Sequence, residues 1–428
     1  MSSRPTKIVL IGAGSASFGL GTVRDIVQSP ELRGSTLALV DINGQAVSTM
    51  AELAKRLSAA AGADLSVTCT TERREALSGA DFVVVSIERE RERLWRLDFQ
   101  VPLKHGIEQV EGENGGPGGL FHSLRNIPPV LGIARDMEEL CPEALLINFT
   151  NPMSRICLAL AQHSRVRFVG LCHGVHNHRY RLGQIMCYDA EDMVPTAAGI
   201  NHFTWILELR SKRTGEDLYP LLREREPGFD PTYLPLNRYL FHQFGLFPSP
   251  SDDHPGEYLA WAWEFCGLGG YDFEAGERYR NELWARIERI LSGQEDMGEL
   301  VTRRSGERAV DIMGALASGK GGYEWAVNIP NRGHIENLPD GCIVEVPAVV
   351  SPRGIMGVHV GELPEGAAVP LRQQVAVQEL VVEAAVTGDR RTALHAMLAD
   401  PVVKSARAAE QVLDELLRLE ADYLPQFR

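Results

Sequence analysis

A cysteine and a histidine occupy two short motifs with the residue types of a metal site. Cys172 lies in Gly-Leu-Cys-His-Gly, and His202 follows in Gly-Ile-Asn-His-Phe. A thiolate and an imidazole brought together suit a divalent transition metal. Cysteine alone is more often a core thiol, because free cysteine is among the most buried residue types. Paired with His202 and its motif, Cys172 is better explained as a metal ligand.

A glycine-rich turn near the N-terminus predicts a nucleotide-binding site. Residues 7–11 form an apolar run typical of a strand, and residues 18–28 have the pattern of a helix. Gly12 and Gly14 in the turn between them allow the backbone to approach a pyrophosphate, whose charge would face the helix N-terminus. Ser17 replaces the third glycine of the usual pattern, so the turn needs support from the rest of the domain.

The second predicted strand gives that support. Residues 37–40 are apolar and are followed by Asp41. A carboxylate at this strand end accepts hydrogen bonds from both ribose hydroxyls and repels a 2′-phosphate, which favours NAD over NADP. The residues expected to contact the cofactor are Gly12, Gly14, Ser15, Ser17, Phe18, Asp41 and Ser86.

Apolar runs and helix-like stretches alternate through the first half of the chain. Four further strands are expected near residues 65–69, 82–87, 144–149 and 168–171. Six strands with helical crossovers predict an α/β fold, a doubly wound parallel sheet of the Rossmann type in residues 1–196. Its cleft would lie beyond the carboxyl ends of the strands. Ser86, Asn148, Asn151 and Cys172 fall at those ends.

The second half, residues 197–428, has a different pattern. A chain of 428 residues is too long for one ordinary core, since single cores stop growing at roughly 250 to 300 residues. Strands are expected at 204–210 and 343–349, and helices at 278–292, 307–317, 371–385 and 405–419. This mixture predicts an α+β lobe that caps the nucleotide cleft. The apolar faces of its last helices would serve the core or a homo-oligomer interface.

Composition excludes several classes of protein. Forty-three Lys and Arg against 57 Asp and Glu give a formal charge of −14, which disfavours nucleic acid as a partner. No apolar run approaches the roughly 20 residues needed to cross a bilayer, and the polar start of the chain shows no secretory signal. The seven cysteines lack framework spacing, which is typical of reduced thiols. We therefore expect a cytoplasmic protein.

Four further segments carry polar residues that a simple core would not need. They are the acidic, glycine-rich loop 111–119, the strand end at 148–153, residues 251–258 (Ser-Asp-Asp-His-Pro-Gly-Glu-Tyr) and residues 328–339, which begin Asn-Ile-Pro-Asn and end Asn-Leu-Pro. With the glycine turn and the motifs of Cys172 and His202, they resemble glycoside hydrolase family 4, the NAD- and divalent-metal-dependent glycosidases. The resemblance covers most of the chain.

The resemblance implies an unusual hydrolysis. NAD⁺ would oxidise the sugar at C3, which acidifies the C2 proton. A base would remove that proton, the C1 substituent would leave, water would add, and the NADH just formed would reduce the C3 ketone. A metal on the C2 and C3 oxygens would stabilise the developing negative charge. No opposed pair of catalytic carboxylates is needed in such enzymes.

The resemblance also assigns roles to matching positions. Cys172 and His202 would hold the metal, usually Mn²⁺, with waters and two sugar hydroxyls. The side chains expected to contact the substrate are Asn114, Asn151 and Asn201. His173 and Glu113 are the candidates for protonating the leaving oxygen. Glu113 and the following Asn114 depart from a pattern in which relatives carry aspartate. Asp253 and Tyr258 are equal candidates for the C2 base.

The residue at position 173 indicates whether the sugar substrate is phosphorylated. Relatives that act on phosphorylated sugars carry aspartate or asparagine there, whereas those acting on unphosphorylated glycosides resemble this chain with its histidine. A galactoside, a glucoside and a glucuronide all remain open, most readily alpha-linked. Arg89, Arg91 and Arg93 alternate with glutamates, which is typical of a solvated helix face. One of these arginines could instead bind a substrate carboxylate or sulfonate.

Two other functions fit parts of the sequence. A 2-hydroxyacid dehydrogenase shares the two-lobe plan but has no use for a thiolate ligand. A catalytically inactive nucleotide sensor would keep Gly12, Gly14 and Asp41 without needing Cys172 and His202. By resemblance, we expect a homodimer or homotetramer that binds a small glycoside and has no nucleic-acid or membrane partner.

Overall fold

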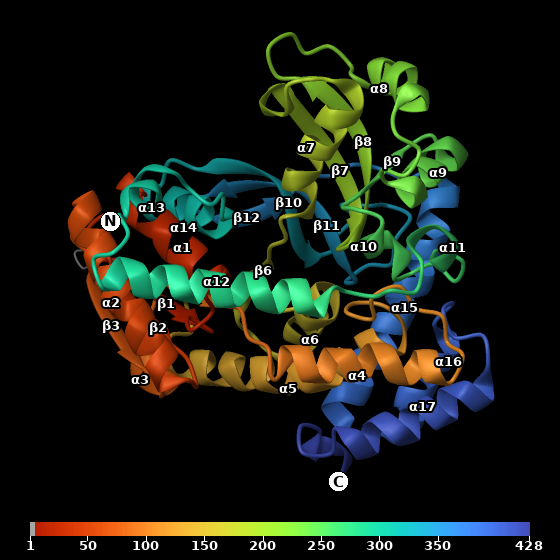
Figure 1. The fold of residues 1–428 in the computed structure, drawn as a ribbon, viewed down its shortest axis with the longest axis horizontal. Coiled ribbons are helices and arrows are strands. Elements are labelled where there is room, and N and C mark those ends of the chain that lie inside the picture. The colour runs from red at the N-terminus through yellow and green to blue at the C-terminus, as the bar shows by residue number, and fades with distance from the viewer. Residues whose placement is uncertain (1–4) are drawn as a thin grey trace.

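Six parallel strands form the sheet predicted for the first half of the chain. The computed structural model describes residues 5–428. The strands are β1 (Lys7–Ile11), β2 (Thr36–Val40), β3 (Ser66–Thr70), β4 (Phe82–Val85), β5 (Leu145–Asn148) and β6 (Arg167–Gly170), in the order β3-β2-β1-β4-β5-β6 (Figure 1). The doubly wound parallel sheet is thus confirmed. The order reverses between β1 and β4, where such sheets bind ligands beyond the strand ends.

Both faces of this sheet are covered. Successive side chains of a strand point to opposite faces. On one face, β1 contributes Ile8 and Leu10 to a core shared with α1 (Phe18–Val27) and α2 (Gly44–Ala61). On the other face, Val9 and Ile11 pack with α5 (Gly116–Leu140) and α6 (Met153–His163). Burial on both sides explains why β1, β2 and β4 are apolar runs in the sequence, whereas β3, at the edge of the sheet, is polar and largely exposed.

The sheet continues into the second half of the chain. β10 (Gly322–Pro330) pairs with β6 through Asn328 and Gly170, and the order proceeds through β11 (Ile343–Ser351), β7 (Met193–Ile200), β8 (Phe203–Ser211) and β9 (Phe247–Ser249). β12 (Gly354–Gly357) pairs with β11. These additional strands are antiparallel to their neighbours. The mixed second lobe is confirmed, but it shares one sheet with the first, and the predicted division at 196/197 falls within β7.

Helices complete both lobes. They are α3 (Arg73–Leu77), α4 (Arg91–Lys104), α7 (Gly174–Met186), α8 (Tyr219–Arg225), α9 (Pro235–Phe244), α10 (Asp253–Gly256), α11 (Trp263–Cys266), α12 (Phe273–Leu291), α13 (Gly298–Thr302), α14 (Arg308–Ser318), α15 (Glu365–Thr387), α16 (Arg390–Ala399) and α17 (Ala406–Leu419). Short 3-10 turns are η1 (Pro30–Leu32), η2 (Ala190–Asp192), η3 (Glu226–Gly228) and η4 (Pro425–Phe427). Within residues 5–428, no helix is long and apolar enough to cross a membrane.

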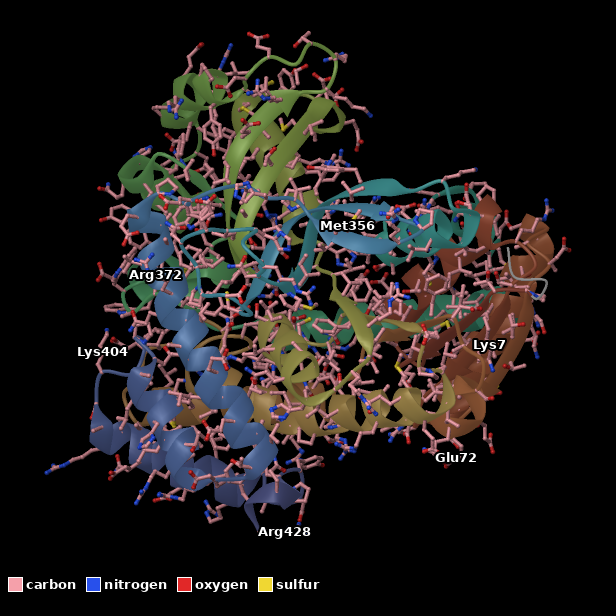
Figure 2. All side chains as sticks on the ribbon, turned by 180° about the vertical axis from the view of Figure 1, so that it is seen from behind. Lys7, Glu72, Met356, Arg372, Lys404 and Arg428 are labelled. Atoms are coloured by element: carbon pink, nitrogen blue, oxygen red, sulfur yellow. The ribbon has the colours of Figure 1, made fainter. Side chains whose placement is uncertain are left out.

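The last three helices return to the first lobe. α15 packs on α5 and α6, and α17 contacts α4 and α5. Their apolar side chains join the same core as Val9 and Ile11 of β1. Seen from behind, this C-terminal segment, with Arg372 and Lys404, lies on the opposite side of the molecule from Lys7 (Figure 2). These C-terminal helices of the predicted α+β lobe therefore cover part of the parallel sheet itself.

A buried ion-pair network holds the end of α17 in place. Arg125 of α5 pairs with Asp98 of α4 and with Glu420 just after α17, each at 2.5 Å. The side chains of both acids are fully buried. Removing one partner of a buried network leaves uncompensated charge and costs about 3–5 kcal/mol.

We expect Arg125→Leu to lower the thermal unfolding midpoint clearly, because it leaves two carboxylates buried without their cation. Arg74→Ala is the matched control, since Arg74 pairs with Asp136 and Glu139 at the surface. Exposed pairs contribute at most about 1 kcal/mol, so this control should change the midpoint little. Scanning calorimetry measures both variants, and equal shifts would contradict the role given to Arg125.

Candidate active site

The glycine turn after β1 forms a close backbone cradle at the carboxyl edge of the sheet. Gly12 has a φ of +91°, and a Cβ there would lie 1.8 Å from the carbonyl oxygen of Ser86. Gly14 donates its N–H to Asp41 Oδ2 at 2.8 Å, and its Cβ would lie 2.8 Å from that carboxyl group. A side chain would fill this cradle at either position. The turn therefore brings together Gly12, Gly14, Asp41 and Ser86, as dinucleotide binding requires.

The start of α1 adjoins this cradle. Ser15 Oγ accepts the N–H of Phe18 and lies near Ser17 Oγ, both at 3.3 Å. The ring of Phe18 packs against Phe149 at a centroid distance of 4.6 Å. The N-terminus of α1, with its partial positive charge, thus adjoins the space that a pyrophosphate would occupy. Cofactor contacts by Ser15, Ser17 and Phe18 stay predictions that this geometry supports.

His202 is held in an unusual position between β7 and β8. It has a φ of +67° and is 3% exposed. Its Nδ1 is buried and has no hydrogen-bond partner among the described residues. Burial, followed by the nearby charge of His254, lowers the pKa of His202 well below its usual value. A neutral imidazole with a partnerless nitrogen is the form that binds a metal.

Two glutamates complete a cluster with His202. Glu113, His202 and Glu257 each offer a ligand atom within 4.8 Å of the other two, and all three are buried. Glu257 Oε1 has no partner among the described residues, whereas Oε2 accepts the N–H groups of Asn114 and Gly115. Burial and the charge of Glu113 raise the pKa of Glu257 to about 7. Partnerless nitrogen and carboxylate oxygen atoms fit a divalent cation such as Mn²⁺.

Glu113 is held by three donors. Oε2 accepts from the side-chain amides of Asn114 at 3.0 Å and Asn151 at 3.2 Å, and Oε1 accepts from Arg91 at 3.1 Å. Asn151 follows the carboxyl end of β5, so the cluster lies at the same edge of the sheet as the glycine turn. These three donors fix the orientation of the Glu113 carboxylate within the cluster.

Cys172 lies outside this cluster of three. Its Sγ accepts the N–H of Gly174 at 3.4 Å and contacts the side chain of Asn201. Desolvation and the charge of Glu345 raise its pKa to about 12. The Asn201 amide nitrogen is committed to Glu345 Oε1 at 3.0 Å, while its Oδ1 has no partner within residues 5–428. The roles of Cys172 as ligand and Asn201 as substrate contact therefore stay predictions.

His173 begins α7 beside Cys172. Its Nε2 lies 2.9 Å from Glu307 Oε2, and its ring lies 6.0 Å from that of Phe149. Burial opposes protonation, but the hydrogen bond and charge of Glu307 outweigh it and raise the pKa of His173. Glu307 was not among the residues predicted from the sequence, because nothing in its local pattern marks it.

The two base candidates have opposite protonation preferences. Asp253 Oδ1 lies 2.9 Å from His254 Nδ1; desolvation raises the pKa of Asp253, but His254 outweighs it and holds that pKa well below its usual range. Tyr258 is 3% exposed and donates to the Asn201 carbonyl oxygen at 3.2 Å. Burial and the charge of Glu257 raise its pKa well above 10, although Arg155 opposes them.

His254 and Glu257 belong to the site although neither was selected as a site residue from the sequence. The rings of His254 and His202 meet edge to face at 4.2 Å. Desolvation disfavours the imidazolium, but Asp253 and the acids Glu111 and Glu257 raise the pKa of His254 to about 9. Both residues stand in the polar segment 251–258, which marked the region but not the individual roles.

The arginine-rich start of α4 is only partly a solvated face. Arg89 and Arg93 are exposed, as that pattern predicts. Arg91 instead pairs with Glu88 and with Glu113, and its guanidinium lies 4.5 Å from the Trp95 ring centroid. The expectation of a purely solvated face was therefore wrong for Arg91, which supports the cluster through Glu113.

Comparisons with known proteins agree with this geometry. The Family 4 glycosyl hydrolase model matches residues 7–187, and that of the Family 4 glycosyl hydrolase C-terminal domain matches residues 197–403. An alpha-glucosidase of Erwinia rhapontici is 38% identical over 98% of this chain and 99% of its own length. An alpha-galactosidase of Rhizobium meliloti (strain 1021) is 32% identical over 98% of this chain and 89% of its own.

A solved structure shows the same fold. It is a 6-phospho-alpha-glucosidase from gut microorganisms in complex with NAD and Mn²⁺, with a TM-score of 0.86 and 21% identity over 99% of this chain and 100% of that one. The two family matches together span most of the described chain, and the relatives align over nearly its whole length. The chain therefore belongs to glycosyl hydrolase family 4.

Proposed function

We propose that this protein hydrolyses a neutral, unphosphorylated glycoside with the help of NAD and a divalent cation, through transient oxidation of the sugar at C3. The main support is the cluster of Glu113, His202 and Glu257, two of which carry buried atoms without partners. Asn151 links this cluster to the sheet edge that carries the glycine turn. Membership in family 4 weighs against the dehydrogenase alternative, which has no use for such a cluster.

The groups that the chain would bind supply the electron chemistry. When bound, NAD⁺ would accept hydride from the sugar and return it, while the cation would stabilise negative charge on the C2 and C3 oxygens. Gly12, Gly14 and Asp41 would hold the dinucleotide. His202, with Cys172 or the two glutamates, would hold the cation.

The side chains around the cluster would move the protons. His173, with Nε2 bound to Glu307, would protonate the leaving oxygen from its other ring nitrogen. Glu113 is a weaker candidate for that step, because three donors already point at its oxygens. Asp253 and Tyr258 both stay candidates for the C2 base, and the phenol would need the bound cation to lose its proton.

The charges around the cluster favour a neutral sugar. Arg91 is paired with Glu88 and Glu113, and His254 with Asp253, so both of these cations are already engaged. A phosphate or carboxylate on the sugar would have to displace one of these pairs or face the acids Glu111 and Glu257. The histidine at position 173 points the same way, by resemblance to relatives that act on unphosphorylated glycosides.

The proposed reaction requires three additions. We expect release of nitrophenol from a p-nitrophenyl α-glycoside to need NAD⁺, Mn²⁺ and a thiol reductant together, because each supports a separate part of the site. Absorbance at the nitrophenol and NADH wavelengths measures both products. No net NADH should accumulate, since hydride returns to the sugar. Steady NADH formation, or turnover after chelation of the metal, would contradict the proposal.

Substitution of a proposed metal ligand should weaken Mn²⁺ binding, whereas substitution of a nearby acid should not. We expect Cys172→Ser and His202→Gln each to weaken Mn²⁺ binding at least tenfold, since even outer partners of a metal contribute about 10–100-fold to affinity. The Mn²⁺ paramagnetic resonance signal measures the free ion directly. Glu111→Gln is the control, because it removes a nearby carboxylate that lies outside the cluster. Full Mn²⁺ affinity in Cys172→Ser would remove that residue from the ligand set.

The charge argument predicts the order of substrates. A neutral α-glucoside or α-galactoside should have a kcat/KM at least about tenfold higher than the corresponding glucuronide or 6-phosphate, a difference of about 1.4 kcal/mol in transition-state stabilisation. Initial rates with matched aglycones measure this ratio. Preference for an anionic sugar would overturn the assignment of a neutral substrate while leaving the family chemistry intact.

A further inference from the structure

A short segment of the second lobe is anchored to the nucleotide-binding helix. Asp25 of α1 is fully buried, and its carboxylate accepts the backbone N–H groups of Ser305 at 2.6 Å, Gly306 at 2.9 Å and Glu307 at 2.8 Å. Ser305 Oγ also donates to the carbonyl oxygen of Gly21 on the same helix at 3.2 Å. A carboxylate that gathers three consecutive N–H groups fixes the path of a chain segment.

Two glycines suit the close approach of the anchored segment to α1. Gly306 has a φ of +93°, a conformation that favours glycine. A Cβ on Gly21 would lie 3.3 Å from Ser305 Oγ. The segment and the helix are therefore fitted to each other, although almost 300 residues separate them in the sequence.

The hydrogen bonds between Asp25 and residues 305–307 place Glu307 beside His173. The Glu307 side chain is 9% exposed, while that of His173 is 41% exposed. Packing alone therefore does not hold the imidazole, and the 2.9 Å contact between Nε2 and Glu307 Oε2 is its directional restraint. On one side the ring lies near Phe149, which in turn packs on Phe18 at the start of α1. The two side chains beside His173, Glu307 and Phe149, are thus both held by contacts with α1.

We propose that Glu307 is a positioning residue that orients the His173 imidazole, and that Asp25 sets the place of Glu307 from the nucleotide-binding helix. Glu307 occupies Nε2, which leaves Nδ1 as the ring nitrogen that can reach the leaving oxygen of the substrate. This inference rests on the proposed function, in which His173 protonates that oxygen. It assigns to Glu307, in the second lobe, an effect on catalysis that depends on His173.

The dependence on the leaving group tests this role. A p-nitrophenolate leaves without prior protonation, whereas an alkoxide needs a proton donor, whose contribution is typically 10²–10⁴-fold. In Glu307→Ala, we expect kcat for the methyl glycoside to fall at least about tenfold more than kcat for the p-nitrophenyl glycoside of the same sugar. Glu307→Gln should retain more activity on the methyl glycoside than Glu307→Ala, because its amide oxygen still accepts from Nε2–H. NAD⁺ and Mn²⁺ affinities should stay unchanged in both.

Glu299→Ala is the matched control, because Glu299 lies on α13 close to the anchored segment and forms ion pairs at the surface. It should affect both substrates alike and little. Asp25→Asn should reproduce the selective loss, since its amide group cannot accept all three N–H groups. Circular dichroism establishes whether this variant folds. If it does not, the Glu307 variants still decide the question.

A double-mutant cycle with His173→Ala completes the test. If Glu307 acts through His173, Glu307→Ala should cause no further loss on the methyl glycoside once the imidazole is absent. Additive losses, or equal losses on the two substrates in Glu307→Ala, would overturn the positioning role alone. A wild-type enzyme that turns over neither glycoside would overturn the proposed function as well.

Discussion

The carboxylate of Glu257 joins the segments from which the candidate active site is built. One oxygen accepts the N–H groups of Asn114 and Gly115, which holds the loop before α5, while the other has no partner among the described residues, and the carboxylate as a whole is grouped with His202 and Glu113. A Cβ on Gly115 would lie 2.1 Å from the Glu257 carbonyl oxygen, so the two segments meet backbone to backbone. Asp400 holds the same loop from the C-terminal helices by accepting the Gly116 N–H at 3.1 Å. The loop 114–116, Glu257 and Asp400, which are distant in the sequence, are therefore held together around the Glu257 carboxylate.

This arrangement concentrates negative charge where water is excluded. Burial and neighbouring acids raise the pKa values of Glu111 and Glu257, because like charges in a low dielectric disfavour ionisation. Arg91 and His254 offset part of that cost. A divalent cation would offset the remainder and also satisfy the partnerless atoms of His202 and Glu257. The groups whose mutual repulsion raises these pKa values are therefore also the groups that a bound cation would stabilise.

Local patterns in the sequence predicted the parts of this molecule that local forces determine. Most of the parallel strands are apolar runs, and Gly12, Gly14 and Asp41 stand at fixed places around a strand end, so the parallel sheet was predicted correctly and the turn forms where it was expected. The contacts of these three residues with the cofactor stay predictions. His202 could be selected because its motif is distinctive. Glu257 and Glu307 could not, since each is a single acid whose importance arises from a contact more than 100 residues away.

The sequence predicted a second lobe that caps the first, but not the single sheet that the two lobes share. β10 has polar side chains among its buried residues, including Glu324 and Asn328, so no simple pattern in residues 322–330 identifies β6 as its neighbour. Its place is decided by the single register pair of Asn328 with Gly170, where a Cβ on the glycine would lie 2.9 Å from that of Asn328. Arg91 was misjudged for a related reason, because a surface-like charge pattern gives no sign of a partner such as Glu113.

The sheet that runs from β6 through β10 and β11 to β7 limits how this enzyme can open. A hinge between the lobes would have to separate strands that meet at single register pairs, Asn328 with Gly170 and Glu345 with Gly199, and also the contacts of α15 with α6 and β7. A rigid-body opening of one lobe away from the other, as in two-domain binding proteins, would therefore cost free energy. Entry and exit of a sugar would then depend on local displacement of the loops around the strand ends that carry the site residues.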